Sequence, residues 1–174
     1  MKNILFVLCA LLFCGCASNV ATNFDKVELV KVDQLTGNNL TRTPFDQEVV
    51  YLNARCETKP DGQKKYYLFT EVIAPEFTLQ SGDSLILNLH NEVITFAPTN
   101  SPSFDSRKRF VTTFYPVHPQ VLVALAKTTD ASVRIKGTSS MIDKKLSPRN
   151  VELFWDFAWK CSLLTKDTKT KAGG

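Results

Sequence analysis

The chain has 174 residues and carries 21 lysines and arginines against 17 aspartates and glutamates, which gives a formal net charge of +4. This length fits one domain, and a core of that size needs neither a metal nor a dense disulfide frame to hold it. Domains that bind nucleic acid usually carry a larger positive excess gathered in a stripe, so the mild charge argues against nucleic acid as a partner.

The N-terminus has the form of a secretion signal. Lys2 stands near the start, and an unbroken apolar stretch follows over residues 4–13. A membrane-spanning helix needs about 20 apolar residues, and this stretch is shorter. We therefore expect residues 1–15 to be a signal peptide that is removed.

The segment "LFCGC" resembles the lipobox of bacterial lipoproteins, in which a small residue precedes a cysteine that is lipidated and becomes the first residue. Bulky residues stand before Cys9 and Cys14, whereas Gly15 stands before Cys16. The resemblance therefore implies that Cys16 carries the lipid. Two or three acyl chains on one residue give stable membrane anchoring.

Sorting in the same family depends on the residue after the lipidated cysteine. Asp at that position favours retention in the inner membrane of Gram-negative bacteria, and here Ala17 occupies it. The resemblance thus implies a lipid-anchored protein of the outer membrane that faces the periplasm. The membrane, reached through the N-terminal lipid, is its first expected partner.

The remainder divides by composition into three parts. Residues 16–25 are polar and read as a lipidated N-terminus and tether, residues 26–165 as a single β-rich domain, and residues 166–174, "KDTKTKAGG", as a flexible tail. Within the domain, residues 36–46 read as a loop because of their Gly, Asn and Pro content.

Alternating apolar residues and polar turns predict strands and hairpins. In chain order, the predicted strands and hairpins are "KVELVKV" over 26–32, "QEVVYLNARCE" and "KKYYLFTEVI" around the turn "KPDG", "SLILNLHNEVITF" with its bend at His90 and Asn91, "RKRFVTTFYPV", and "ASVRIKG" with "SSMIDKKL" around Gly137.

Two helices interrupt the β pattern. Pro119 is expected at the start of the first because proline is favoured at the first helical position. Pro148 starts the second in the same way, with Ser147 as its side-chain cap. The predicted fold is mainly β (α+β): an antiparallel sheet or β-sandwich with two packed helices, the second C-terminal.

From about Tyr51 onward, the order of elements is similar to that of small uncharacterised bacterial envelope lipoproteins. The pieces that carry this resemblance are "YLNARCE", "SLILNLHNEVITF", "VRIKG" and "LSPRNVELFWDF". It implies the fold and transfers no catalytic residue.

Cys56 and Cys161 are the cysteines that remain after Cys16. Strand alternation places Cys56 on an apolar face, and helical spacing places Cys161 on the same stripe as Val151, Phe154 and Ala158. Since an oxidising compartment favours pairing, the two are a disulfide candidate. The alternative is two separate buried thiols that pack as small hydrophobic groups.

No catalytic or metal-binding motif appears in the sequence, and no cofactor or metal is expected. His90 and His118 fall at a predicted bend and a predicted helix start, where a turn or capping role is expected. Paired carboxylates stay open as an alternative, because several acidic residues lie on or beside strands. These residues are Glu48, Glu57, Glu71, Asp83 and Glu92.

Basic pairs and triplets flank several predicted strands. Lysines on edge strands block aggregation between sheets; alternatively these groups form a patch for anionic lipid phosphates. The basic runs are Lys64 and Lys65, Arg107, Lys108 and Arg109, and Lys144 and Lys145.

The C-terminal helix is apolar around most of its circumference, so it is either buried or covered by a partner. Trp155 and Trp159 are the candidate interface residues. Two functions follow from the sequence. The favoured one is a non-catalytic binding or assembly module of the envelope that contacts another envelope protein, and the alternative is a hydrolase of envelope polymers that uses paired carboxylates.

Overall fold

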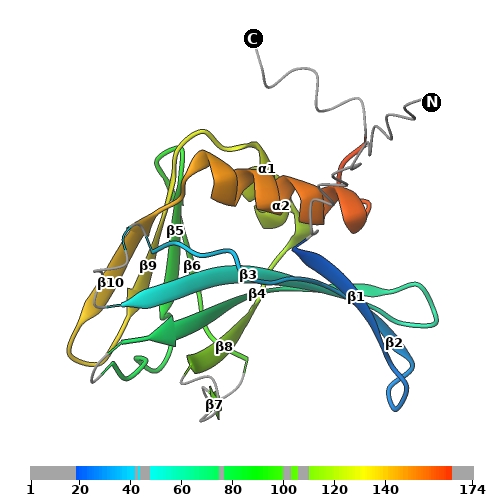
Figure 1. Cartoon of the computed structure of the whole chain (residues 1–174), viewed down its shortest axis with the longest axis horizontal. Coiled ribbons are helices and arrows are strands. Elements are labelled where there is room, and N and C mark those ends of the chain that lie inside the picture. Colours follow the sequence, from blue (N-terminus) through cyan, green and yellow to red (C-terminus); the bar gives the residue numbers. More distant parts are fainter. Residues whose placement is uncertain are drawn as a thin grey trace, which may run out of the picture.

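A computed structural model provides the structure of this chain (Figure 1), and it describes residues 19–41, 43, 48–74, 77–99, 103–105 and 110–165. The expected signal peptide, the expected lipid anchor at Cys16, the basic run Arg107, Lys108 and Arg109, and the tail at 166–174 lie outside the described residues.

The described part of the chain consists mainly of strands, with one helix over residues 119–127 and another over residues 148–160. In chain order these are β1 (Val20–Asp25), β2 (Val30–Leu35), β3 (Val49–Thr58), β4 (Lys64–Ile73), β5 (Leu85–Leu89), β6 (Glu92–Phe96), β7 (Ser103–Asp105), β8 (Phe110–Pro116), α1 (Pro119–Lys127), β9 (Ala131–Lys136), β10 (Met141–Lys145) and α2 (Pro148–Lys160).

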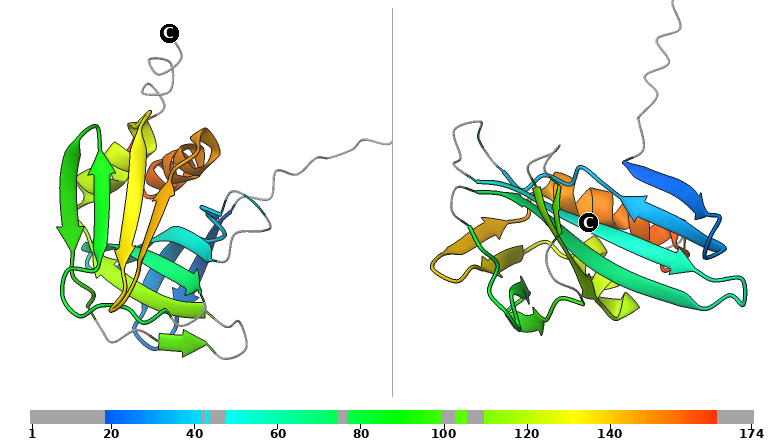
Figure 2. Two further views of the ribbon diagram at one scale, coloured as in Figure 1. Left: turned by 90° about the vertical axis from the view of Figure 1, so that its left-hand side faces the viewer. Right: turned by 90° about the horizontal axis from the view of Figure 1, so that it is seen from below.

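The strands make two antiparallel sheets, which confirms the predicted mainly β fold with two helices. One sheet has the order β1-β2-β3-β4-β8-β7 and the other β10-β9-β5-β6. The two sheets stand at a steep angle to one another, and α1 and α2 lie on the same side of the six-stranded sheet (Figures 1 and 2). The helices contact each other, and α2 also contacts β2.

One hydrophobic core joins both sheets and both helices. Strand β3 shows the expected alternation, because Val50, Leu52, Ala54 and Cys56 are all fully buried. The core also includes Phe154 of α2. Burying one large apolar side chain stabilises a fold by roughly 1.5–3 kcal/mol, so this shared core holds the two sheets together.

Both helices begin where the sequence predicts. His118 is the N-cap of α1, and its Nδ1 accepts the N–H of Gln120 at 3.4 Å. Ser147 is the N-cap of α2: its Oγ accepts the N–H of Asn150 at 3.3 Å, and Asn150 Oδ1 accepts the N–H of Ser147 at 2.8 Å. This reciprocal pair satisfies two backbone donors that the first helical turn leaves open.

Asn150 also ties α2 to the loop before β3. The residue is 5% exposed, and its amide nitrogen donates to Asn38 Oδ1 at 2.7 Å and to the Asn39 carbonyl at 2.8 Å. Asn38 is fully buried and donates its own N–H to Asn53 Oδ1 at 3.1 Å. The start of the last helix is therefore anchored through a buried polar network.

The hairpin of β5 and β6 turns at the predicted residues. His90 and Asn91 have φ of 50° and 71°, the left-handed pair that a two-residue turn between antiparallel strands requires. His90 therefore acts as a turn residue, as its position in the sequence indicated.

The first two strands differ from the prediction. A strand was expected over 26–32 and a tether over 16–25, but β1 occupies 20–25 and β2 occupies 30–35. Asp25 breaks the expected strand, because its Oδ1 accepts the N–H groups of Val27 (2.9 Å) and Glu28 (3.1 Å). Strand β1 escaped prediction because it lies at the sheet edge and every residue after Val20 is exposed, which leaves no apolar alternation to read.

Neither described helix is long and apolar enough to cross a membrane.

Candidate functional site

The outer surface of the six-stranded sheet carries a row of aromatic rings. Along β3, β4 and β8, these rings alternate with the residues that face the core. Cys56 is one of the core-facing residues of β3 and packs toward α2. The rings therefore lie on the side of the sheet that faces away from the helices. We call this surface the aromatic face. Its members are Tyr51, Tyr67, Phe69, Phe110 and Phe114.

The rings contact one another in two groups. Phe69 and Phe114 stack with centroids 5.1 Å apart, and Tyr67 meets the same Phe114 edge-on at 6.4 Å. Tyr51 and Phe110 form a second edge-on pair at 5.5 Å. Such aromatic pairs contribute about 0.5–1.5 kcal/mol beyond the burial of their area. Only Phe69 is fully covered, at 2% exposed, so the face presents half-buried rings to its surroundings.

Arg55 lies over the first group of rings. Its guanidinium carbon is 5.9 Å from the centroid of Phe114, and its Nε is 2.8 Å from Glu57 Oε1. A cation placed over an aromatic ring is attracted by the negative face of that ring. The arginine is thus held by a carboxylate on one side and a ring on the other.

A surface pocket of about 260 Å³ opens at this point. It is lined by Arg55, Glu57, Tyr67, Thr99 and Phe114. Burial raises the pKa of the Tyr67 hydroxyl, which therefore stays protonated at neutral pH as a hydrogen-bond donor. The pocket combines the rings of Tyr67 and Phe114 with three polar side chains. Its volume is below the roughly 300–1,000 Å³ of typical small-molecule sites.

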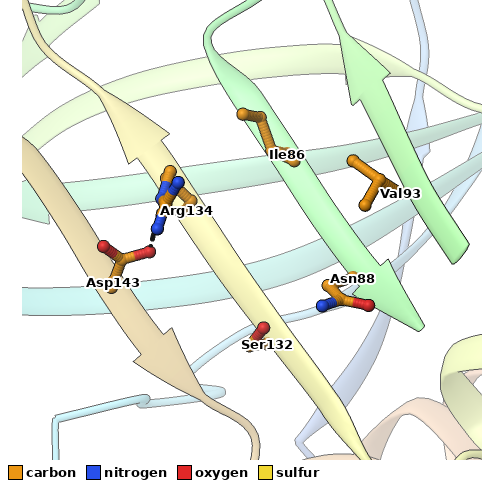
Figure 3. A pocket seen from close by; sticks show the side chains of 6 residues that line it. All are labelled: Ile86, Asn88, Val93, Ser132, Arg134 and Asp143. Carbon is orange, nitrogen blue, oxygen red and sulfur yellow. Dashed lines mark hydrogen bonds and ion pairs between the residues drawn. The ribbon is translucent and has the colours of Figure 1, made fainter. Parts of the chain in front are cut away.

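A second pocket, of about 200 Å³, lies on the four-stranded sheet. Figure 3 shows its ion pair between Arg134 and Asp143 on neighbouring strands, with Nε 2.6 Å from Oδ1. Both side chains are about half exposed, and exposed pairs of this kind contribute little binding or stability. The lining residues are Ile86, Asn88, Val93, Ser132, Arg134 and Asp143.

Neither of these two pockets brings two carboxylates together. The first holds Glu57, which is paired with Arg55, and the second holds Asp143, which is paired with Arg134. The other acidic candidates bond elsewhere. Glu71 accepts from the Asn53 amide at 2.8 Å, Glu48 receives Lys144 at 3.4 Å, Asp83 accepts from Thr95 at 3.3 Å, and Glu92 is an exposed residue of β6.

Cys56 and Cys161 do meet inside the protein, but as free buried thiols, so the disulfide expected from the sequence is not present in this structure. The two thiols influence each other's ionisation. The Cys161 side chain lowers the pKa of Cys56 to about 7, while the Cys56 side chain and burial raise the pKa of Cys161. The prediction that both thiols point into the core is correct.

The two tryptophans of α2 differ in their surroundings. Trp155 is half-buried and packs against the core, whereas Trp159 is 44% exposed. The expected core stripe is only partly right, because Val151 is half-buried. The buried residues of the helix are Asn150, Leu153, Phe154, Phe157 and Ala158, and Cys161 follows at its C-cap.

The described basic runs have separate contacts. Lys144 and Lys145 lie on the edge strand β10 and pair with Glu48 and Asp130. Lys64 donates to the carbonyl of Cys161 at 2.9 Å. Lys144 and Lys145 thus lie on an edge strand, as one of the two interpretations expected. Lys64 instead donates a hydrogen bond to the backbone at the end of α2.

Sequence reasoning missed the aromatic face. The signal was present, because Tyr51 and Arg55 alternate with the apolar residues of β3, and Tyr67 and Phe69 do so on β4. What the sequence does not reveal is that Phe114 comes to lie beside them. In the described part of the chain, no three His, Cys, Asp or Glu residues are grouped so that they could hold a metal ion.

Comparison with family models finds no match to this chain, and comparison with curated proteins finds none either.

Proposed function

We propose that this chain is a lipid-anchored protein of the bacterial outer membrane, and that its β domain is a non-catalytic module that binds another envelope protein. The observation that carries the proposal is the aromatic face, where Arg55 lies over Phe114 beside an open pocket. The anchor at Cys16 rests on the lipobox resemblance.

The composition of this surface supports a protein partner. Tyrosine, phenylalanine and arginine are enriched in the centres of protein interfaces, where rigid rings supply contact area at low entropic cost. The rings here are held in place by one another, and Arg55 is held by Glu57. A preorganised surface of this kind loses little conformational freedom when a partner binds.

The charges of the pockets support binding over hydrolysis. A glycosidase needs two carboxyl groups about 5–9.5 Å apart, one of them as acid. In both surface pockets the single carboxylate is neutralised by an arginine within 2.8 Å. This arrangement fixes side-chain geometry and provides no second carboxylate for acid–base work.

The test is photocrosslinking in intact cells, with a benzoylphenylalanine residue introduced at Thr99 on the rim of the first pocket. We expect one crosslinked protein band that weakens strongly when Phe114→Ala or Arg55→Ala is added. The matched control carries the probe at Ser132, in the pocket of the other sheet, where no such band is expected.

A band of equal strength with and without Phe114→Ala would show that the aromatic face does not bind this partner. The same bands at Thr99 and Ser132 would show contact without specificity. Melting curves of Arg55→Ala and Phe114→Ala must remain cooperative, so that a lost band reports binding and not unfolding.

A further inference from the structure

The end of α2 presents an exposed aromatic ring at the surface. Trp159 is 44% exposed, whereas Trp155, one turn earlier, packs against the core. The tryptophan ring is amphipathic and is enriched where proteins meet the interfacial region of a bilayer.

This end of the helix lies beside the first residue of the first strand. Lys160 Nζ donates to the carbonyl of Val20 at 2.8 Å, and the carbonyl of Asn19 accepts the N–H of Thr36 at 3.0 Å. The chain is therefore fixed to the body of the protein from Asn19 onward. Strand β1 begins where α2 ends.

The distance to the expected anchor is short. Four residue steps separate Cys16 from Val20, and even a fully extended chain covers about 14 Å in four steps. A lipid on Cys16 thus keeps Val20, which the end of α2 contacts through Lys160, within about 14 Å of the acyl chains' point of attachment. That distance is less than half the thickness of a bilayer.

Two ammonium groups lie at the same end. Lys160 bonds to the Val20 carbonyl, and Lys64 bonds to the Cys161 carbonyl at 2.9 Å. Both lysines are held by backbone carbonyls, so their positive charge is oriented but not cancelled by these bonds. Lysines close to a membrane surface are attracted to anionic lipid headgroups.

We propose that the C-terminal end of α2, comprising Trp159, Lys160 and the neighbouring Lys64, rests on the phospholipid surface that holds the lipid anchor. Trp159 lies among the headgroups and the two lysines face lipid phosphates. This inference rests on the proposed anchor at Cys16 and adds the orientation of the domain on its membrane.

Another exposed apolar group competes for the bilayer. The last part of β1 and the turn that follows it, here called the β1–β2 turn, carry Phe24, Val27 and Leu29, which are 58%, 92% and 55% exposed. It lies at the far end of β1, and a strand of six residues spans about 17–20 Å. In the proposed orientation this turn points away from the anchor. A measurement of bilayer contact should therefore detect the end of α2 and not the β1–β2 turn.

The chain contains two tryptophans, which makes fluorescence quenching a direct test. The protein is expressed in bacteria from the full chain, purified and mixed with vesicles of phosphatidylethanolamine and phosphatidylglycerol, with or without bromine on the acyl chains near the headgroup. Trp155→Phe leaves Trp159 as the single emitter, and Trp159→Phe leaves Trp155. We expect brominated vesicles to quench Trp159 strongly and Trp155 little, and Trp159 emission to shift to shorter wavelength when vesicles are added.

A third protein tests the competing turn. In a chain with Trp155→Phe and Trp159→Phe, the change Phe24→Trp places the single emitter at the β1–β2 turn, and we expect no quenching. Quenching of this emitter in place of Trp159 would overturn the proposal and assign the bilayer contact to the turn.

Flotation of the vesicles distinguishes failure of the proposed orientation from failure of the proposed lipid anchor. If the protein floats with the vesicles but bromine leaves Trp159 emission unchanged, the anchor stands and the proposed orientation is wrong. If the protein does not float, the anchor itself fails, and the orientation fails with it. Trp159 is half exposed, so Trp159→Phe should leave the melting temperature nearly unchanged and keep the comparison valid.

Discussion

Replacing Asn150 with alanine should destabilise the protein by more than the loss of one hydrogen bond, because this side chain makes several. Asn150 closes the N-cap of α2 through Ser147 and donates to Asn38 Oδ1 and to the Asn39 carbonyl. Without Asn150 Oδ1 the N–H of Ser147 loses its acceptor, and loss of a capping hydrogen bond costs about 1 kcal/mol. Leaving a buried acceptor without a donor costs about 1–3 kcal/mol more, and Asn38 is fully buried.

The expected loss in the free energy of unfolding is therefore about 2–4 kcal/mol. For a domain of this size, that corresponds to a fall in Tm of roughly 5–15 °C. Equilibrium unfolding in urea measures the free energy, and calorimetry measures the Tm.

Two variants on the same helix separate the contributions. Ser147→Ala removes the cap and keeps both amide bonds of Asn150, so we expect a loss of about 1 kcal/mol. Glu152→Ala removes an exposed ion pair with Arg149 and should cost no more than about 0.5 kcal/mol. A loss below 1 kcal/mol for Asn150→Ala, or a value equal to that of Ser147→Ala, would refute the role given to the buried network.

Three further predictions each concern a change at one or two residues. Gly137→Ala should lower stability by about 1–3 kcal/mol, measured by urea unfolding, because its Cβ would stand 2.7 Å from the Phe77 ring and 3.0 Å from two carbonyl oxygens; a neutral result would show that Phe77 moves freely. Cys56 has its pKa lowered from 9.0 to about 7, so its ionisation contributes stability that is fully present above pH 9 and is lost as the pH falls through 7. Cys161→Ala removes the neighbouring thiol that is the largest cause of this shift and should flatten the dependence of the free energy of unfolding on pH between pH 7 and 9; an unchanged slope would contradict the assignment. Cys16→Ala should abolish lipidation and Cys14→Ala should leave it intact, as judged by the mass of the mature N-terminus, and lipid found on Cys14 would exclude the assignment to Cys16.

Structural elements that are determined by residues close together in the sequence could be predicted. The start of α2 is one, because Ser147, Pro148 and Asn150 form the cap and first turn by themselves. The bend at His90 and Asn91 is another, since the two strands on either side are short, alternating and adjacent. In both cases the residues that decide the structure lie within a few positions of each other.

Features that depend on distant pairing could not be predicted. Strand β4 pairs with β8 across an intervening segment that contains another hairpin, and only this pairing places Phe114 beside Phe69 and under Arg55. Similarly, periodicity indicated that Cys56 and Cys161 both face the core. Whether their sulfurs are joined covalently depends on the separation and orientation of the two side chains, which no sequence pattern encodes.

The position of α2 at the end of the chain determines the order in which the fold can be completed. Both sheets are encoded before residue 148, yet the fully buried rings of Phe154 and Phe157 come from this last helix. A chain synthesised from its N-terminus therefore presents sheet surface without this helical cover until residues 148–160 have been added. Partly folded chains with exposed apolar sheet are prone to aggregate, so a truncation before residue 148 is expected to produce a chaperone substrate or a protease substrate and not a smaller stable domain.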